Sequence, residues 1–86
     1  MEKIIKILSL TNNLILISQI EEVGADIGEP DCKLIEPYLL NMSEETLSPW
    51  LSNVSLQDTF MIQSDKILTI TDPKPTLLEK YENLIK

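Results

Sequence analysis

The apolar residues of the chain gather into short runs separated by polar turns, which predicts a β-rich protein. Residues 3–10 and 14–20 are dominated by isoleucine and leucine. Asn13 lies in the polar turn between them, and asparagine tolerates the positive φ that short hairpin turns require. We therefore expect two strands joined by a tight turn. Both runs are apolar at adjacent positions, so one face of each strand should meet the core and the other a neighbouring element.

The next part of the chain predicts a loop followed by a bent strand. Residues 21–31 contain the only two glycines, Gly24 and Gly28, together with several carboxylates, which is typical of a loop. Residues 32–42 are apolar again. Because Pro37 cannot donate a hydrogen bond to a sheet, we expect this strand to bend at the proline or to lie at an edge.

Two further strands are predicted after a polar connection at residues 43–49. Over residues 50–63 apolar and polar side chains alternate, which is typical of a half-exposed strand. A polar turn at residues 63–66 leads into a final apolar run at residues 67–70, so these last two strands should form a hairpin. The expected sheet thus has about five strands.

The C-terminal segment changes from a period of two to helical spacing. This pattern predicts a short amphipathic helix over residues 76–85, with its apolar stripe formed by Leu77, Leu78, Tyr81, Leu84 and Ile85. Thr76 and Glu79 have the spacing of a capping box. A helix this short is stable only when it is docked, so we expect it to pack against the sheet.

Composition limits the function classes. The chain has 86 residues and a net charge of −7, and it is expected to form one domain. One cysteine and no histidine leave oligomerisation as the route to extra stability, because a disulfide or zinc site within the chain is not available. The seven lysines are outnumbered by acidic residues, which argues against partners such as duplex DNA or an anionic membrane. Without a long apolar run near the N-terminus, we expect a cytoplasmic protein.

The candidate catalytic and metal-binding groups have simpler structural explanations. Cys32 lies beside Lys33, which lowers a thiol pKa where the two groups are exposed, but free cysteines are most often buried. Asp26, Glu29 and Asp31 lack the alternating oxygen ligands of a calcium loop, which favours a solvated acidic loop. We therefore expect no catalytic residue, cofactor or metal.

The order of these elements resembles the Sm-like fold. The first Sm motif combines apolar positions with an Asn-Gly pair and a later glycine. The stretch "LTNNLILIS" follows it with Leu10, Asn12 and Leu16, while Asn13 and Ser18 replace the two glycines.

The second Sm motif is an apolar pair, an Arg-Gly, two polar residues and an apolar strand. The stretch "MIQSDKILTI" is similar to it, with Gln63 and Ser64 in place of the Arg-Gly. The likeness extends from Lys3 to Asp72 and is greatest to the small Sm-like proteins of marine cyanophages.

The resemblance implies a strongly bent, five-stranded antiparallel barrel of the SH3-like type at about residues 3–72. The C-terminal helix at about residues 76–85 would replace the N-terminal helix that the family usually has. Sm-like proteins close into rings by pairing the fourth strand of one subunit with the fifth strand of the next. A homo-oligomeric ring of about five to seven copies is the implied assembly.

Sm-like proteins also bind single-stranded RNA around the ring pore with the loops of both motifs. The RNA-binding candidates carried over are Gln63, Ser64, Asp65, Lys66, Gly24, Asp26 and Gly28. Two functions stay open: an RNA-binding ring in RNA regulation or processing, and a non-catalytic, phage-encoded assembly or adaptor protein that binds no nucleic acid. The strand order favours the first, while the acidic charge and the missing Arg-Gly favour the second. Lys66 accordingly lies at a pore or is an ordinary solvated turn residue.

Overall fold

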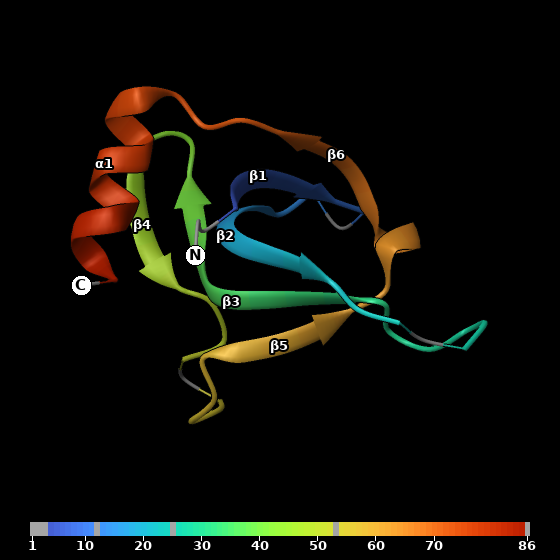
Figure 1. Cartoon of the computed structure of the whole chain (residues 1–86). Helices are drawn as coiled ribbons and strands as arrows, with labels where there is room; N and C mark the ends of the chain where they lie inside the picture. The colour runs from blue at the N-terminus through green and yellow to red at the C-terminus, as the bar shows by residue number, and fades with distance from the viewer. Residues whose placement is uncertain (1–3, 12, 25, 53, 86) are drawn as a thin grey trace.

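A computed structural model describes residues 4–11, 13–24, 26–52 and 54–85, and this part of the chain is mainly β with one C-terminal helix (Figure 1). Its strands are β1 (Ile5–Leu10), β2 (Ile15–Glu22), β3 (Cys32–Asn41), β4 (Thr46–Pro49), β5 (Thr59–Ile62) and β6 (Ile67–Thr71). A 3-10 turn, η1 (Ser64–Lys66), joins β5 to β6, and helix α1 (Pro75–Leu84) follows.

All of these strands belong to one open antiparallel sheet. Along the sheet the order is β4-β3-β2-β1-β6, and β5 also pairs with β3. On one side β3 therefore has two neighbours: its first half pairs with β5 and its second half with β4. The sheet has β6 at one margin and β4 and β5 at the other, as Figure 1 shows.

The predicted first hairpin is confirmed. β1 and β2 pair antiparallel from Ile5 opposite Gln19 to Ser9 opposite Ile15. Asn13 adopts a φ of 66° in the connecting turn, the left-handed conformation that asparagine tolerates. Asn12, the other asparagine of this turn, lies outside the described residues.

The prediction for residues 43–49 is wrong, because this segment contains β4. Leu47 pairs opposite Leu40 of β3 and is half-buried, so one apolar residue in a polar segment was enough to anchor a short strand. The described part of the sheet consequently has six strands rather than five.

The prediction of one strand over residues 50–63 is also wrong. Only Thr59–Ile62 form a strand, and the residues before it follow turns in which Leu51 adopts a φ of 62°. β5 and β6 do not form the predicted hairpin, because η1 turns the chain so that β5 pairs with β3 and β6 with β1. The apolar alternation before β5 is therefore exposed loop sequence.

The predicted bend of β3 at Pro37 is confirmed. Between β2 and β3 the register shifts so that one residue, Ser18, faces the two residues Glu36 and Pro37. Such a bulge bends the strand. Glu36 adopts a φ of 52°, and its N–H donates to the Asp58 carbonyl at 2.6 Å, which ties the bend to the segment before β5.

The inner face of the sheet forms the main core. Leu8, Leu10, Leu16 and Leu34 make its fully buried centre. Around them pack half-buried residues that come from several strands and loops: Leu14, Ile20, Leu39, Trp50, Ile62 and Ile67. Removal of these side chains from water is the main force that curls the sheet around one core.

The outer face of the sheet is apolar too, and α1 covers part of it. Because side chains alternate along a strand, Ile17 faces away from its buried neighbour Leu16, yet it is also completely buried. It lies opposite Tyr38, whose ring meets the ring of Tyr81 from α1 edge-on at 5.7 Å. The expected docking of the C-terminal helix is confirmed by Tyr81, which is fully buried.

The start of α1 differs from the prediction. The helix begins at Pro75, with Lys74 at the N-cap position and no side-chain cap, so the predicted capping box of Thr76 and Glu79 is wrong. Proline is favoured at the first helical position because its fixed φ suits a helix and its missing N–H would have no partner there. The proline therefore starts the helix two residues earlier than the capping pattern suggested, with the N-cap at Lys74 in place of Thr76.

The Tyr81 hydroxyl joins α1 to the bulge between β2 and β3. It accepts a hydrogen bond from the Gln19 N–H at 3.2 Å, and it lies 2.8 Å from the Glu36 carbonyl and 3.2 Å from the Ile35 carbonyl, either of which can accept its hydrogen. The register shift separates these backbone groups, and the hydroxyl supplies a partner for the Gln19 N–H and for a carbonyl at the bend, while the Ser18 hydroxyl also donates to the Ile35 carbonyl. Burial raises the pKa of Tyr81, so the hydroxyl keeps its proton.

We predict that Tyr81→Phe lowers the free energy of unfolding by about 1–3 kcal/mol, because buried backbone groups lose a partner. Urea denaturation followed by circular dichroism measures the change. Tyr38→Phe is the matched control, since no hydrogen bond of its hydroxyl is found within the described residues. Equal stability of the two variants would show that the Tyr81 hydroxyl does not matter.

Candidate functional site

Three connections meet at one end of the sheet and form the candidate site. They are the turn after β1, the loop between β2 and β3, and η1, which lies beside that loop at the right of Figure 1. The Thr11 N–H donates to the Lys66 carbonyl at 3.0 Å, which joins the first turn to η1. The Val23 N–H donates to the Asp31 carbonyl at 3.0 Å and closes the base of the loop.

Side-chain hydrogen bonds join η1 to the loop. The Gln63 amide nitrogen donates to the Gly28 carbonyl at 2.6 Å. The Ser64 N–H and hydroxyl donate to the two carboxylate oxygens of Asp31, each at 2.7 Å. The two groups of predicted site residues, one at residues 63–66 and one on the loop between β2 and β3, are thus in direct contact.

Asp31 is the acceptor on which this junction depends. Hydrogen bonds from the Ser64 hydroxyl and from the Ser64 N–H hold the pKa of the Asp31 carboxyl below its ordinary value. The charged carboxylate therefore persists into mildly acidic solution. Sequence reasoning had grouped Asp31 with a solvated acidic loop, and the only signal for its role was a serine at the start of a short turn.

The remaining predicted residues are exposed around this junction. Gly24 and Asp26 lie on the loop, while Asp65 and Lys66 lie on η1. The only glycine with a positive φ is Gly28, at 89°, which explains a glycine in the turn that Gln63 contacts. Asp65 is next to Lys66, so the one cation of this site stands among carboxylates.

The predicted burial of Cys32 is confirmed. It lies on the inner side of β3 with only 5% of its surface exposed. Burial raises the pKa of the Cys32 thiol, and the nearby charges of Asp31 and Glu22 raise it further, so the group stays a neutral thiol at neutral pH. Lys33 does not produce the lowered pKa of a reactive cysteine.

Within the described residues, no group of three histidine, cysteine or carboxylate side chains is arranged to hold a metal ion. The same part of the chain has no helix whose length and apolar character would let it cross a membrane. What the site offers chemically is a set of hydrogen-bonding groups and one exposed ammonium group on a stiffened turn. Such groups can bind a polar ligand through hydrogen bonds.

Comparison with known proteins places the chain in a family. The sequence of residues 3–86 matches a family of unknown function (DUF6561), so the chain belongs to this family over almost its whole length. A search among curated proteins found no match.

We predict that Asp31→Ala frees η1 from the loop and speeds hydrogen exchange of the Ser64 amide, as measured by NMR. Asp26→Ala is the matched control, because Asp26 contributes its backbone carbonyl rather than its side chain to the turn with Glu29. Unchanged exchange of Ser64 in Asp31→Ala would contradict the described junction.

The hydrogen bonds from Ser64 to the Asp31 carboxylate also predict that the stability of the fold depends on pH. The folded-state pKa of Asp31 is below the ordinary value of 3.8, so its carboxylate stabilises the fold above that pH and loses this contribution as the pH falls through the lowered folded pKa. An NMR titration of the Asp31 carboxyl carbon should show a midpoint below 3.8. A midpoint above that value would contradict the prediction.

Proposed function

We propose that this protein is a non-catalytic assembly protein whose copies join edge to edge into a closed homo-oligomeric ring. The observation that carries the proposal is the open margin of the sheet at β6. Ile70 pairs opposite Leu8, which is completely buried, yet 51% of Ile70 is exposed. The core of a single copy is therefore incompletely covered along this strand.

The rest of β6 has the same character. Leu68 is 65% exposed, and within the described residues β6 pairs with β1 only, just as β5 pairs with β3 only. An unpaired strand edge with exposed apolar side chains is a template for pairing with another chain. Pairing β5 of one copy with β6 of the next would satisfy both edges and cover Leu68 and Ile70.

The sequence resemblance to Sm-like proteins supplies a mode of closure. β5 and β6 correspond to the fourth and fifth strands of that family, which pair between neighbouring subunits of a ring. Ser18, which replaces a motif glycine, lies at the bulge where β2 and β3 change register. These points support an Sm-like assignment, with β4 as an addition, and a ring of about five to seven copies.

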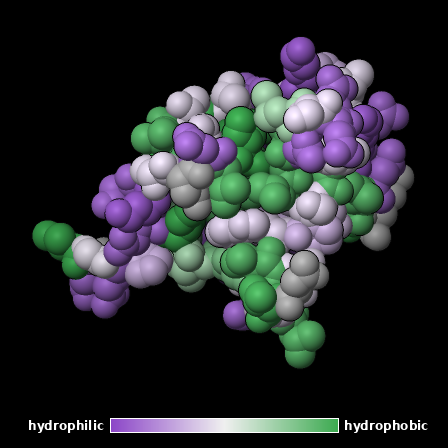
Figure 2. All heavy atoms as spheres, turned by 180° about the vertical axis from the view of Figure 1, so that it is seen from behind, coloured by the Kyte–Doolittle hydropathy of each residue, from purple (hydrophilic) through white to green (hydrophobic). Residues whose placement is uncertain are grey.

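Exposed apolar side chains also occur away from β6. Figure 2 shows hydrophobic residues over the middle of one face and on the protruding connection between β4 and β5, where Val54 and Leu56 are exposed. Isolated exposed apolar residues are normal on a protein surface. What distinguishes β6, and β5 with its exposed Met61, is the combination of apolar side chains with a backbone edge that has no partner strand within the described residues.

We predict that the double variant Leu68→Lys/Ile70→Lys is monomeric, while the unchanged protein sediments as one species of several copies. Lysines on an edge strand oppose pairing because they must remain hydrated. Ile27→Lys is the control, since Ile27 is fully exposed on the loop between β2 and β3 and lies away from β6. Sedimentation velocity distinguishes the outcomes, and a monomeric unchanged protein would overturn the proposal.

RNA binding at the centre of the ring is the second candidate function. It is favoured by the contacts of Gln63 with Gly28 and of Ser64 with Asp31, which hold Lys66 on a stiffened turn beside the loop of the other motif. Ring symmetry would repeat Lys66 around the centre, so that single weak phosphate contacts add up. The net charge of −7 per copy limits such binding to this spot.

We predict weak binding of short oligo(U) that Lys66→Glu abolishes, with a flatter salt dependence of any residual binding because fewer counterions are released. Gln63→Ala should weaken binding less, since it removes hydrogen bonds but no charge. Lys33→Glu is the control for charge alone, because Lys33 lies on β3. Fluorescence anisotropy at low salt measures these affinities. No binding by the unchanged ring would leave the protein an assembly or adaptor protein that binds no nucleic acid.

A further inference from the structure

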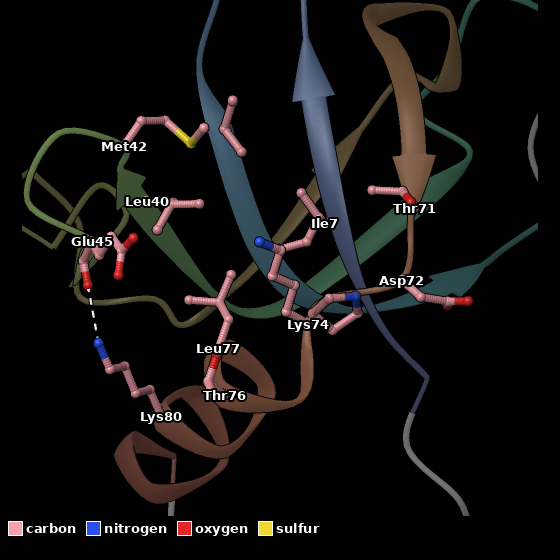
Figure 3. A pocket seen from close by; sticks show the side chains of 12 residues that line it. Ile7, Leu40, Met42, Glu45, Thr71, Asp72, Lys74, Thr76, Leu77 and Lys80 are labelled. Carbon is pink, nitrogen blue, oxygen red and sulfur yellow. Dashed lines mark hydrogen bonds between the residues drawn. The ribbon is translucent and has the colours of Figure 1, made fainter.

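A hollow of about 430 Å³ lies beside the start of α1, on the outer face of the sheet (Figure 3). Its walls come from β1, β2, the end of β3, the connection from β6 and the first turns of the helix. This volume is within the range of about 300–1,000 Å³ that is usual for small-molecule sites. It is at the opposite end of β6 from η1, because Thr71 and Asp72 line it.

The hollow exists because the outer face of the sheet extends beyond the part that α1 covers. Ile17, beneath the helix, lies opposite Ile7 of β1, so both side chains are on the outer face. Tyr81 buries the part around Ile17, whereas Ile7 and Ile15 remain half-exposed. The apolar face that the helix leaves uncovered forms the base of the hollow.

The apolar wall is aliphatic and adaptable. Figure 3 shows Leu40, Met42 and Leu77 directed toward the space between the helix and the sheet, with Ile7 on the far side. Met42 is 66% exposed, although it is an apolar residue on the edge of an apolar surface. Unbranched methionine chains adjust to the shape of a ligand. Such a wall suits a flexible alkyl chain.

The rim is cationic at the helix. Lys74 and Lys80 both line the hollow. Lys80 donates one long hydrogen bond, 3.4 Å, to the Glu45 carbonyl, which leaves its other donors available. Within the described residues Lys74 makes no ion pair, and the carboxylate of Asp72 is already paired with Lys6. The side chain of Glu45 is the remaining acidic group on this rim.

From this combination of an aliphatic wall and two lysines we propose that the hollow binds a free medium-chain aliphatic carboxylate. The alkyl chain would lie against Ile7, Leu40 and Leu77, and the carboxylate would accept hydrogen bonds from Lys74 and Lys80. Charge complementarity favours an anion here, although the protein as a whole is strongly acidic. A small ligand is favoured over a protein partner because the volume of the hollow lies within the range usual for small-molecule sites.

Decanoate, kept below its micelle concentration, is the probe for this site. In methyl NMR spectra of the full chain, it should shift the signals of Ile7, Leu40, Met42 and Leu77 in a saturable way. Butyrate has the same head group and a shorter chain, so it buries less apolar surface and should bind at least about tenfold more weakly. Decyltrimethylammonium has the same chain with a cationic head and should also bind more weakly.

Variants separate the two halves of the site. Lys74→Gln/Lys80→Gln should weaken decanoate binding by about tenfold or more, because charge-assisted hydrogen bonds are lost, and should remove the preference over decyltrimethylammonium. Met42→Glu places a like charge beside the ligand and should weaken it similarly. Lys33→Gln and Leu56→Glu are the matched controls, since Lys33 lies on β3 away from the lining and Leu56 on the exposed connection before β5.

Several results would overturn this proposal. They are the absence of saturable shifts with monomeric decanoate, equal affinity for the cationic probe, and unchanged affinity of the Lys74→Gln/Lys80→Gln variant. Binding to vesicles of phosphatidylglycerol without binding of monomeric decanoate would show a membrane contact instead. The Leu68→Lys/Ile70→Lys variant should still bind decanoate, because these residues do not line the hollow. The experiments therefore test the ligand site and the ring assembly separately.

Discussion

One phenolic hydroxyl joins the C-terminal helix to the most irregular part of the sheet. Because of the bulge at Glu36 and Pro37, the first half of β3 pairs with β5 and the second half with β4. The same bulge interrupts the backbone hydrogen bonds between β3 and β2. Buried backbone groups without partners are costly. The Tyr81 hydroxyl reaches them from α1, where it accepts from the Gln19 N–H and donates to one of the two carbonyls at the bend. The helix therefore completes the hydrogen bonding of the sheet as well as covering it.

A second constraint is that this short sheet is apolar on both faces. The inner face is filled by the leucines of the core, whereas a helix of about three turns has to cover the outer face. That helix covers the part of the outer face around Ile17 but leaves Ile7 and Ile15 half-exposed, and this leaves the hollow. At the β6 margin the inner face also stays open, which exposes Ile70. The proposed assembly and the proposed ligand site have the same physical origin, since each would cover apolar surface that a chain of this length cannot bury itself.

Short sequence patterns correctly predicted those elements whose conformation depends on neighbouring residues in the chain. The turn at Asn13, the bend at Pro37 and the amphipathic helix each follow from the conformational preferences of a few residues, and the structure confirms them. The prediction of a strand over residues 50–63 failed because alternation there reflects exposed loop residues such as Val54 and Leu56. A sequence pattern does not show whether an alternating apolar face has a partner.

The candidate site was predictable only in part for a related reason. Resemblance to a family selected Gln63, Ser64 and Gly28, and the structure brings these residues into one junction. The role of Asp31 was not predictable, because its bond with Ser64 spans 33 positions of sequence and depends on how two loops fold back. The hollow beside α1 was missed because its residues are distributed over five elements and the connections between them, and no local pattern unites them.

The long reach of Tyr81 has a consequence for protein synthesis. Its hydroxyl bonds to Gln19 across 62 positions, and the strands that it completes are made long before it. While the ribosome still holds Tyr81 in its exit tunnel, β2 and β3 carry exposed backbone groups at the bulge and an uncovered outer face. Such nascent sheets are prone to aggregate. The hydrogen bonding at the bulge is therefore completed only after the helix has left the exit tunnel and docked on the sheet.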